Sequence, residues 1–507
     1  MQLDKINTVS KLLKGGSSIF LSDIARIVLN MLTLIFIARY IPQDQFGLFS
    51  LALICANFFA AISCVGLENS LPGFIAQKRE IGQKPVVRGA IQSSYRITLG
   101  LSFFFMLVVF CAADPVSRMI GKPDLSTPLK IIAPAIPLIA IALLLTTFLR
   151  SFENYKGKII NLLAFPFLRL LLVAIIIYAN LSFHAIVYSN TVSFFMVFLI
   201  LFFYTKISLR DLFGKKERIL VTKELFWYSL PILGSTIGRQ LMMWTDTIML
   251  GVFSSTVDVG VYSAGIRIIR LVSIIGVSIN FVVLPIIARL YHQEKKQELQ
   301  DIYHSIHGFV LLATLPVFWI FVFSKDFTMQ LFFGTKLGSS NFFLAVLGVG
   351  WFVNAMFGVN TSILLALGKN KIQLCCFLSA IFVNIVSNFI LVPLYSKTGA
   401  ATASCIAFVI YGIFSMIMVN RYVGLNPFKE KRYIFLLAGS FLLTGGLYFL
   451  YEKGYFYVQS LSDIFVHITL YCLLSIVLAL TSGFLRKQQL KTIKHLILYK
   501  GIRKNRI

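Results

Sequence analysis

The chain has 507 residues, of which 58% are hydrophobic and only 13% are charged, and its mean hydropathy is +0.83. Soluble domains carry about 25% charged residues, so this composition excludes a soluble globular protein and indicates an integral membrane protein. The net charge of +27 does not require a nucleic-acid partner, because basic residues accumulate in the cytoplasmic loops of membrane proteins.

Apolar segments long enough to cross a bilayer recur along the whole chain. A crossing helix needs about 20 residues, and the first segment is too long for a signal-peptide core, so we expect it to be retained. The predicted fold is all-α, with about 14 transmembrane helices. They are expected near residues 17–39, 46–71, 89–112, 128–149, 159–180, 184–205, 226–252, 258–288, 305–324, 340–367, 372–394, 399–420, 433–451 and 463–485.

The basic residues divide unevenly between alternate loops. Of the 47 Lys and Arg, we place 33 in the two termini and the loops on their side, eight in the opposite loops and six inside spans. The positive-inside rule therefore puts both termini in the cytoplasm and the protein in the cell membrane.

Two halves of the chain repeat at a constant offset of 213 residues. An even number of spans separates the copies, so the repeat is parallel and relates two six-helix lobes, with two C-terminal helices added. The matched positions are Arg26 with Arg239, Pro72 with Pro285, 46–52 with 259–265, and 156–159 with 369–372.

This repeat sets the expected domain boundaries. They are an N-lobe over 1–205, a cytoplasmic linker over 206–225, a C-lobe over 226–428, two further helices within 429–485, and a basic cytoplasmic tail over 486–507. The tail mixes basic and apolar residues, so it is expected either to lie on the anionic inner leaflet as an amphipathic helix or to be a disordered basic tail.

Six arginines fall inside the predicted spans. An ionised side chain at the bilayer centre costs about 2.5–3.5 kcal/mol on insertion scales, so it faces a partner or a wet cavity. At 1.5 Å per residue, most of them lie about 14–18 Å into a core about 30 Å thick, with Arg96 shallower. The six are Arg26, Arg96, Arg169, Arg239, Arg267 and Arg270.

Only three acidic residues are available inside the spans to balance these arginines: Asp23, Glu68 and Asp246. Arg267 and Arg270 are three residues apart and so share a helix face, as do Asp23 and Arg26, which can partly neutralise each other. Guanidinium groups bind phosphate through two parallel hydrogen bonds. The surplus of positive charge predicts a cationic cavity for a phosphate-bearing substrate, and the alternative is that the charges pair and only stabilise helix packing.

The opening run LLKGGSSIF, LIFIARYIPQDQFGLFSLALICANFF and VGLENSLPGFIAQ resembles the Wzx-type polysaccharide-biosynthesis flippases of the multidrug/oligosaccharidyl-lipid/polysaccharide exporter superfamily, and WTDTIMLGVFSSTVDVGVYSAG echoes it. The resemblance implies a protein that moves a polyprenyl-diphosphate-linked oligosaccharide, such as an O-antigen or capsule repeat unit, to the outer leaflet by alternating access. It also implies a prenyl groove formed by spans 13 and 14, and partners that include the bilayer and the polysaccharide polymerase machinery.

Ion-coupled relatives hold a sodium ion in the second lobe, and the resemblance implies a set of hard oxygen ligands for it here. These are Asp246, Asn384, Asn388, the Ala400 carbonyl and Ser404. Without sodium we expect Asp246 to pair with Arg239. Polar helix–helix contacts are the other explanation for these residues, and coupling to protons or to the membrane potential alone stays open.

Two other functions are alternatives to a flippase. A drug or cation exporter of the same superfamily shares the fold but needs a cavity rich in carboxylates. A membrane glycosyltransferase or polymerase needs a catalytic cluster in a substantial external loop, and the longest such loop, 113–127, is short. We therefore expect a transporter without cofactors rather than an enzyme.

Overall fold

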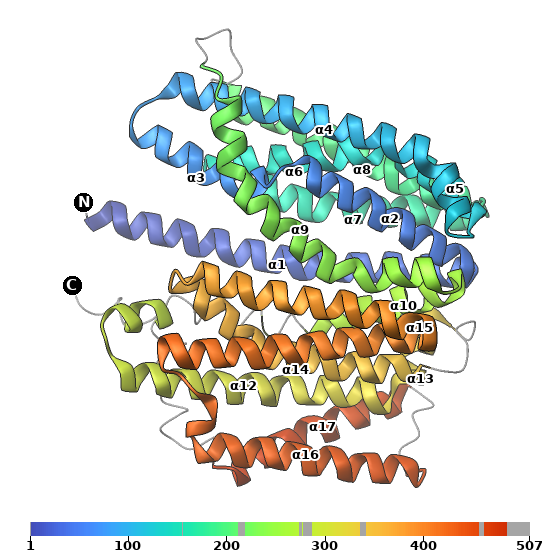
Figure 1. Ribbon diagram of the computed structural model, residues 1–507, viewed down its shortest axis with the longest axis vertical. Coiled ribbons are helices and arrows are strands. Elements are labelled where there is room, and N and C mark those ends of the chain that lie inside the picture. The colour runs from blue at the N-terminus through green and yellow to red at the C-terminus, as the bar shows by residue number, and fades with distance from the viewer. Residues whose placement is uncertain are drawn as a thin grey trace. The chain divides into compact units, whose positions relative to one another are not determined.

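The computed structural model describes residues 2–154, 156–210, 219–272, 276, 286–334, 341–455 and 461–483, and every regular element in these ranges is a helix (Figure 1). Part of the predicted linker, much of the span expected over 258–288 and the whole tail over 486–507 lie outside these residues. The chain forms two compact units, Met1–Ala264 and Gly265–Ile507, here called unit 1 and unit 2.

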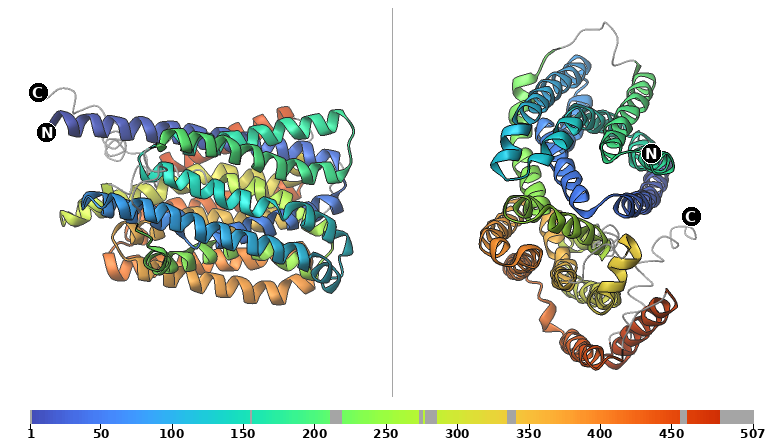
Figure 2. Two further views of the ribbon diagram at one scale, coloured as in Figure 1. Left: turned by 90° about the horizontal axis from the view of Figure 1, so that it is seen from above. Right: turned by 90° about the vertical axis from the view of Figure 1, so that its right-hand side faces the viewer.

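Unit 1 is a bundle of long helices that lie side by side, seen nearly end-on in the right panel of Figure 2. Its helix α9 packs against α2, α3 and α4, which is why the compact unit extends past the predicted lobe boundary. The lobe boundaries themselves stay a prediction. The elements are α1 (Gln2–Tyr40), α2 (Gln43–Ser63), α3 (Leu67–Glu80), α4 (Lys84–Met119), η1 (Pro123–Leu125), α5 (Ser126–Ile132), α6 (Ala135–Ser151), α7 (Lys156–Tyr178), α8 (Phe183–Ser208), α9 (Thr222–Phe253) and most of α10 (Thr256–Ile269).

Unit 2 begins at the end of α10 and is also helical. Its helix α12 packs on α14, α16 and α17, and a shared apolar cluster joins them. The elements are η3 (Arg270–Val272), α12 (Lys296–Phe323), α13 (Lys325–Phe333), α14 (Phe342–Ala366), α15 (Asn370–Val423), η4 (Pro427–Lys429), α16 (Lys431–Glu452) and α17 (Leu461–Thr481).

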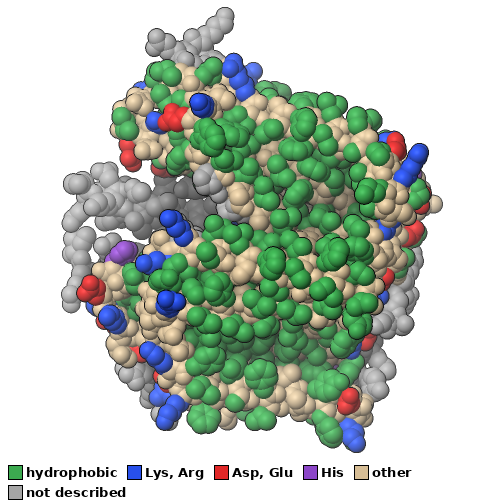
Figure 3. Space-filling model, viewed as in Figure 1, with side chains coloured by type: hydrophobic (Ala, Val, Ile, Leu, Met, Phe, Trp, Pro, Cys, Tyr) green, Lys and Arg blue, Asp and Glu red, His purple; other side chains and the backbone are tan. Residues whose placement is uncertain are grey.

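Among the described residues, ten helices are long and apolar enough to cross a membrane, or eleven if the bent pair Pro123–Ile132 and Ala135–Ser151 is one span. The helices of each unit present hydrophobic side chains along their length, while Lys and Arg gather near helix ends (Figure 3). The protein is therefore a multi-pass membrane protein. The exact number of fourteen spans stays a prediction.

Three breaks shape the spans. Gly66, with φ of +73°, interrupts the helix within the span predicted over 46–71 and separates α2 from α3. Pro134 precedes a 41° bend into α6, as expected where a ring removes a helical hydrogen bond. Ser396, with φ of +49°, interrupts the 54-residue α15 between the two spans predicted there.

The helix boundaries repeat at the offset found in the sequence. Helix α1 ends at Tyr40 and α9 at Phe253, 213 residues later, and α2 begins at Gln43 and α10 at Thr256 with the same spacing. Matching starts and ends at one offset are what a parallel repeat of whole helices predicts.

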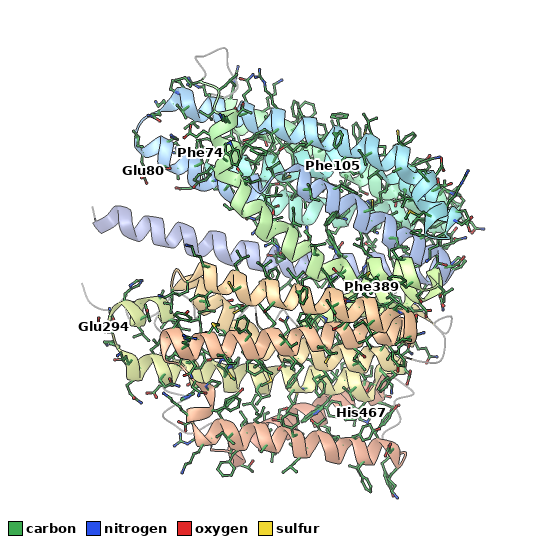
Figure 4. The ribbon with its side chains drawn as sticks, viewed as in Figure 1. Phe74, Glu80, Phe105, Glu294, Phe389 and His467 are labelled. Carbon is green, nitrogen blue, oxygen red and sulfur yellow. The ribbon has the colours of Figure 1, made fainter. Side chains whose placement is uncertain are left out.

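Each unit has its own apolar core. Phe74 on α3, labelled in Figure 4, belongs to the core that α3 shares with α4, α6 and α8 in unit 1. In unit 2, Trp319 on α12 packs edge-on against Tyr471, and His467 on α17 (Figure 4) stacks on the same tyrosine. Full burial of large apolar side chains stabilises by about 1.5–3 kcal/mol each, which fixes these helices against one another.

Candidate substrate cavity

Arg26 lies near the middle of α1 and pairs with an acid on its own helix. Its Nη2 is 3.1 Å from Asp23 Oδ1, and its Nε donates to the same oxygen at 3.2 Å. The spacing of three residues brings the two side chains together on one helix face, as predicted. Both side chains are only half-buried, so the pair leaves guanidinium N–H groups for another acceptor.

Arg239, the repeat counterpart of Arg26, pairs across helices instead. Its Nη2 lies 3.5 Å from Oε1 of Glu68, which ties α9 to the start of α3. The partner predicted in the absence of sodium is Asp246 instead. Ser70 Oγ donates to Ser229 Oγ at 3.0 Å and reinforces the same helix contact. The Arg239 side chain is 57% exposed, whereas that of Glu68 is 21% exposed. Arg239 therefore presents a fixed but accessible guanidinium.

Arg169 has a different environment, because its side chain is buried. Its Cζ lies 5.4 Å from the centre of the Phe49 ring and 6.0 Å from that of Phe165, within cation–π range. The contact with Phe49 links α7 to α2, whereas Phe165 lies on α7 itself. The two contacts favour a packing role for Arg169, and its predicted substrate contact stays a prediction.

Asp246 is buried in α9, and its Oδ2 accepts a hydrogen bond of 2.7 Å from Tyr262 Oη on α10. Tyr262 is the repeat counterpart of Phe49. Sequence reasoning missed Tyr262, whose one signal is a phenol hydroxyl at the position that matches Phe49.

Arg267 and Arg270 belong to unit 2 and lie where α10 passes into the 3₁₀ turn η3. Both are half-buried. The Cζ of Arg270 lies 5.9 Å from the ring centre of Trp351, a buried residue of α14 that sequence reasoning missed. The aromatic face supports the guanidinium from one side and leaves its edge for hydrogen bonding.

The expected sodium ligands divide between the two units. Asp246 is in unit 1, while Asn384, Asn388, Ala400 and Ser404 are buried in α15 of unit 2. Within α15, Asn388 Nδ2 donates to the Asn384 carbonyl oxygen at 2.9 Å. The described residues hold no cluster of three or more His, Cys, Asp or Glu side chains that would suit a metal ion. The sodium site stays a prediction.

An apolar groove of about 420 Å³ opens on unit 2. Helix α16, the predicted span 13, lines it together with α12 and α14. The prenyl groove expected between spans 13 and 14 stays a prediction. Thr444 is one of the few polar side chains in its wall. The other lining residues are Phe318, Val322, Phe323, Phe342, Ala345, Val346, Val349, Phe441, Gly445 and Tyr448.

The long apolar helices, with arginines inside the predicted spans, are those of a multi-pass membrane protein, and comparisons with known proteins show what it resembles. The solved structure of the lipid II flippase MurJ in an inward closed conformation matches with a TM-score of 0.69 and 14% identity, over 92% of this chain and 98% of that one. At this identity the match establishes the fold.

The sequence comparisons establish the family. The model described as polysaccharide biosynthesis protein matches residues 36–341, more than half of the chain, and the model of lipid II flippase MurJ matches 240–467. This chain belongs to the polysaccharide biosynthesis protein family.

Two curated relatives resemble most of the chain. The probable low-salt glycan biosynthesis flippase Agl15 of Haloferax volcanii is 22% identical over 86% of this chain and 89% of its own length. The putative O-antigen transporter of Shigella flexneri is 22% identical over 72% of this chain and 87% of its own length.

Proposed function

We propose that this protein is a flippase that carries a polyprenyl-diphosphate-linked oligosaccharide from the cytoplasmic to the outer leaflet of the cell membrane by alternating access. Its family and its relatives, which are named as a flippase and a transporter, support this function. The observation that carries it is the position of Arg239, which lies in the span predicted over 226–252 and is accessible yet paired with Glu68. Such a guanidinium suits a diphosphate brought into the membrane.

The charge on the substrate supplies a driving force. If the diphosphate crosses with two negative charges, an inside-negative potential of 100 mV favours its outward movement by about 4.6 kcal/mol. The loop charges place both termini in the cytoplasm. The proposed substrate then enters from the cytoplasmic side, where it is made.

The groove on unit 2 suits the other end of such a substrate. Its wall is almost entirely apolar, and burying a prenyl chain there removes it from contact with water as the head group crosses. We assign this groove to the prenyl tail.

The alternative function, a drug or cation exporter, is disfavoured because the arginines inside the predicted spans outnumber the acidic residues there.

Sodium is the coupling ion that we propose, with the Asp246 carboxylate as its charged ligand. Asp246 supplies one negative charge, which matches one sodium ion, and the hydrogen bond from Tyr262 keeps that carboxylate oriented. If Asp246 has no role in ion binding, a proton is the coupling ion or the membrane potential alone drives transport.

A leaflet-transfer measurement tests the function. Purified protein in liposomes should make a labelled polyprenyl-diphosphate-linked oligosaccharide accessible to an impermeant quencher faster than protein-free liposomes do. The same glycan on a neutral prenol should move no faster than in protein-free liposomes. Transport of a cationic dye without glycan transfer would establish a drug exporter, and a change in the mass of the recovered glycan would establish an enzyme.

A further inference from the structure

Unit 1 has an open pocket of about 600 Å³ where the end of α4 and the start of α8 flank α5 (Figure 1). Ile131 and Pro134, which border the bend between α5 and α6, form part of its wall. The volume lies within the range of about 300–1,000 Å³ found for small-molecule sites. The proposed transport does not use this pocket, and the loop charges predict that it lies at the outer surface of the membrane.

Three side chains in the pocket wall can donate hydrogen bonds. Lys130 and Thr127 come from α5, and His184 comes from the start of α8. Thr127 and His184 are exposed, and a hydroxyl and a neutral imidazole each have a hydrogen to donate. The Lys130 ammonium has three N–H donors, of which the Asp114 carboxylate accepts one. Donors from two helices around one pocket suit a ligand group with several acceptor oxygens, such as phosphate.

Hydrogen bonds between helices hold this wall in place. Lys130 Nζ lies 2.6 Å from Asp114 Oδ2 on α4, and Ser126 Oγ donates to the same carboxylate. On the other side, Thr191 Oγ1 of α8 donates to the Ile131 carbonyl oxygen at 3.2 Å. Helix α5 is thus tied to both of its neighbours, so the pocket keeps its form without a ligand.

The charge around the pocket is positive on balance. Across residues 114–130 three basic residues stand against two acidic ones, which leaves a surplus of one positive charge: Arg118, Lys122, Lys130, Asp114 and Asp124. The ion pair inside this segment does not close the pocket, because the side chain of Lys130 is 36% exposed and that of Asp114 is 50% exposed. Exposed ion pairs are weak, so a phosphate can share the ammonium group with the carboxylate.

Two rows of exposed apolar side chains lead away from the pocket. Each row begins at a residue of the pocket wall and continues on the same helix face, with spacings of three and four residues. The side chains in both rows are between 43% and 56% exposed. Because α4 ends and α8 begins at the pocket, both rows run from it toward the middle of the membrane. The rows are Phe110, Leu107 and Phe103 on α4, and Tyr188, Val192 and Phe195 on α8.

We propose that this pocket binds the phosphate group of a glycerophospholipid from the outer leaflet, with its two acyl chains lying along the apolar rows of α4 and α8. Two rows match a lipid with two chains better than a polyprenyl substrate with one, and a free phosphate would make no use of them. Tyr188 has the apolar ring and polar hydroxyl that are common at the membrane–water boundary. This inference does not depend on which substrate the protein carries.

Native mass spectrometry of the delipidated full chain tests the site with phosphatidylglycerol as the ligand. Lys130→Met should weaken binding by about fivefold to tenfold, because a charged hydrogen bond in a partly exposed site is lost. His184→Phe, which leaves the pair of Lys130 and Asp114 intact, should weaken it by about twofold to threefold. Lys453→Met, at an exposed lysine outside the pocket, should bind as wild type does. Diacylglycerol with the same chains should not distinguish wild type from Lys130→Met.

Equal affinities of wild type, Lys130→Met and His184→Phe for phosphatidylglycerol would overturn the proposal. So would inorganic phosphate binding as tightly as the lipid, or a polyprenyl diphosphate binding more tightly than the lipid and losing that affinity in Lys130→Met. If Lys130→Met does not fold, His184→Phe decides the matter, because it changes only an exposed side chain.

The apolar rows have their own test. Leu107→Asn and Val192→Asn should each weaken binding of phosphatidylglycerol, because less apolar surface is available to its chains. Leu442→Asn, at an exposed leucine of α16, is the control and should bind as wild type does. Wild-type affinity in both row variants would contradict the proposed path of the acyl chains.

Discussion

Gly47 of α2 and Gly260 of α10 meet in a contact that is symmetric under the internal repeat. A Cβ built on Gly47 would lie 1.9 Å from the carbonyl oxygen of Thr256, and one built on Gly260 would lie 2.3 Å from that of Gln43. Each would also lie 3.1 Å from the other glycine's amide nitrogen. Gln43 and Thr256, like the two glycines, are 213 residues apart, so the equivalent helices of the two halves cross at equivalent backbone atoms.

Alanine at either glycine should destabilise unit 1. The added methyl group would collide with backbone, which cannot rotate away as a side chain can, so we expect a loss of about 1–3 kcal/mol. Thermal unfolding of Gly47→Ala and Gly260→Ala measures it. Gly100→Ala is the control, because nothing lies within 4 Å of its Cβ position. Equal Tm values for all three variants would mean that the close contact does not exist.

The topology can be tested by labelling single cysteines in a cysteine-free background. Ser255, before α10, and Gln83, before α4, are both exposed in the structure, so burial does not bias the comparison. From the loop charges we expect Ser255→Cys to react with an impermeant thiol reagent applied outside intact cells, and Gln83→Cys to react only after lysis. Labelling of Gln83→Cys in intact cells would reverse the predicted orientation.

Sodium coupling predicts a specific loss at Asp246. Asparagine keeps an oxygen for Tyr262 but removes the charge that balances the ion, so Asp246→Asn should lose the response to sodium. The measurement is thermal stability and transport in sodium against choline at fixed ionic strength and pH. Tyr262→Phe should weaken the sodium response less, since the carboxylate remains. Identical responses of wild type and Asp246→Asn would exclude a functional sodium site at this residue.

The groove on unit 2 predicts a dependence on prenyl length. Gly445 lines the groove and Gly446 does not. A Cβ atom on either glycine would meet nothing within 4 Å, so variants at the two positions form a matched pair. Gly445→Leu should fill the groove and slow transfer of long-chain substrates more than short-chain ones, because less apolar surface can be buried. Gly446→Leu should transfer both as wild type does. The same loss in both variants would remove the groove from the transport path.

Much of the fold was predictable because hydropathy and charge act locally. Most predicted spans coincide with helices, although α1, α3, α4 and α12 extend five or more residues beyond them, and the offset of 213 reappears in the boundaries. Hydropathy could not reveal the break at Gly66 between α2 and α3, since a glycine of positive φ leaves the surrounding sequence apolar.

The site was less predictable, because partners depend on tertiary packing. The Asp23–Arg26 pair follows from helical spacing alone, whereas the pairing of Arg239 with Glu68 requires α9 to lie on α3. Likewise, the contact between Arg270 and Trp351 brings together residues far apart in the chain. Sequence reasoning identified the charged groups but could not choose which one each would meet.

The proposed transport requires that arginines within the spans bind the diphosphate of the substrate. A charged hydrogen bond contributes about 1.5–3 kcal/mol, so its removal should slow transport by about one to two orders of magnitude. We expect this loss for Arg239→Ala and Arg26→Ala, with partial recovery for lysine, which lacks the planar fork. Arg118→Ala, at an arginine near the end of α4, provides the control.

The decisive measurement is the initial rate of leaflet transfer of a polyprenyl-diphosphate-linked oligosaccharide in liposomes containing equal amounts of folded wild type or variant. If Arg239 binds the diphosphate, we expect a loss of about tenfold or more for Arg239→Ala, partial recovery for Arg239→Lys, and an unchanged rate for Arg118→Ala. Wild-type rates for both Arg239→Ala and Arg26→Ala would contradict it.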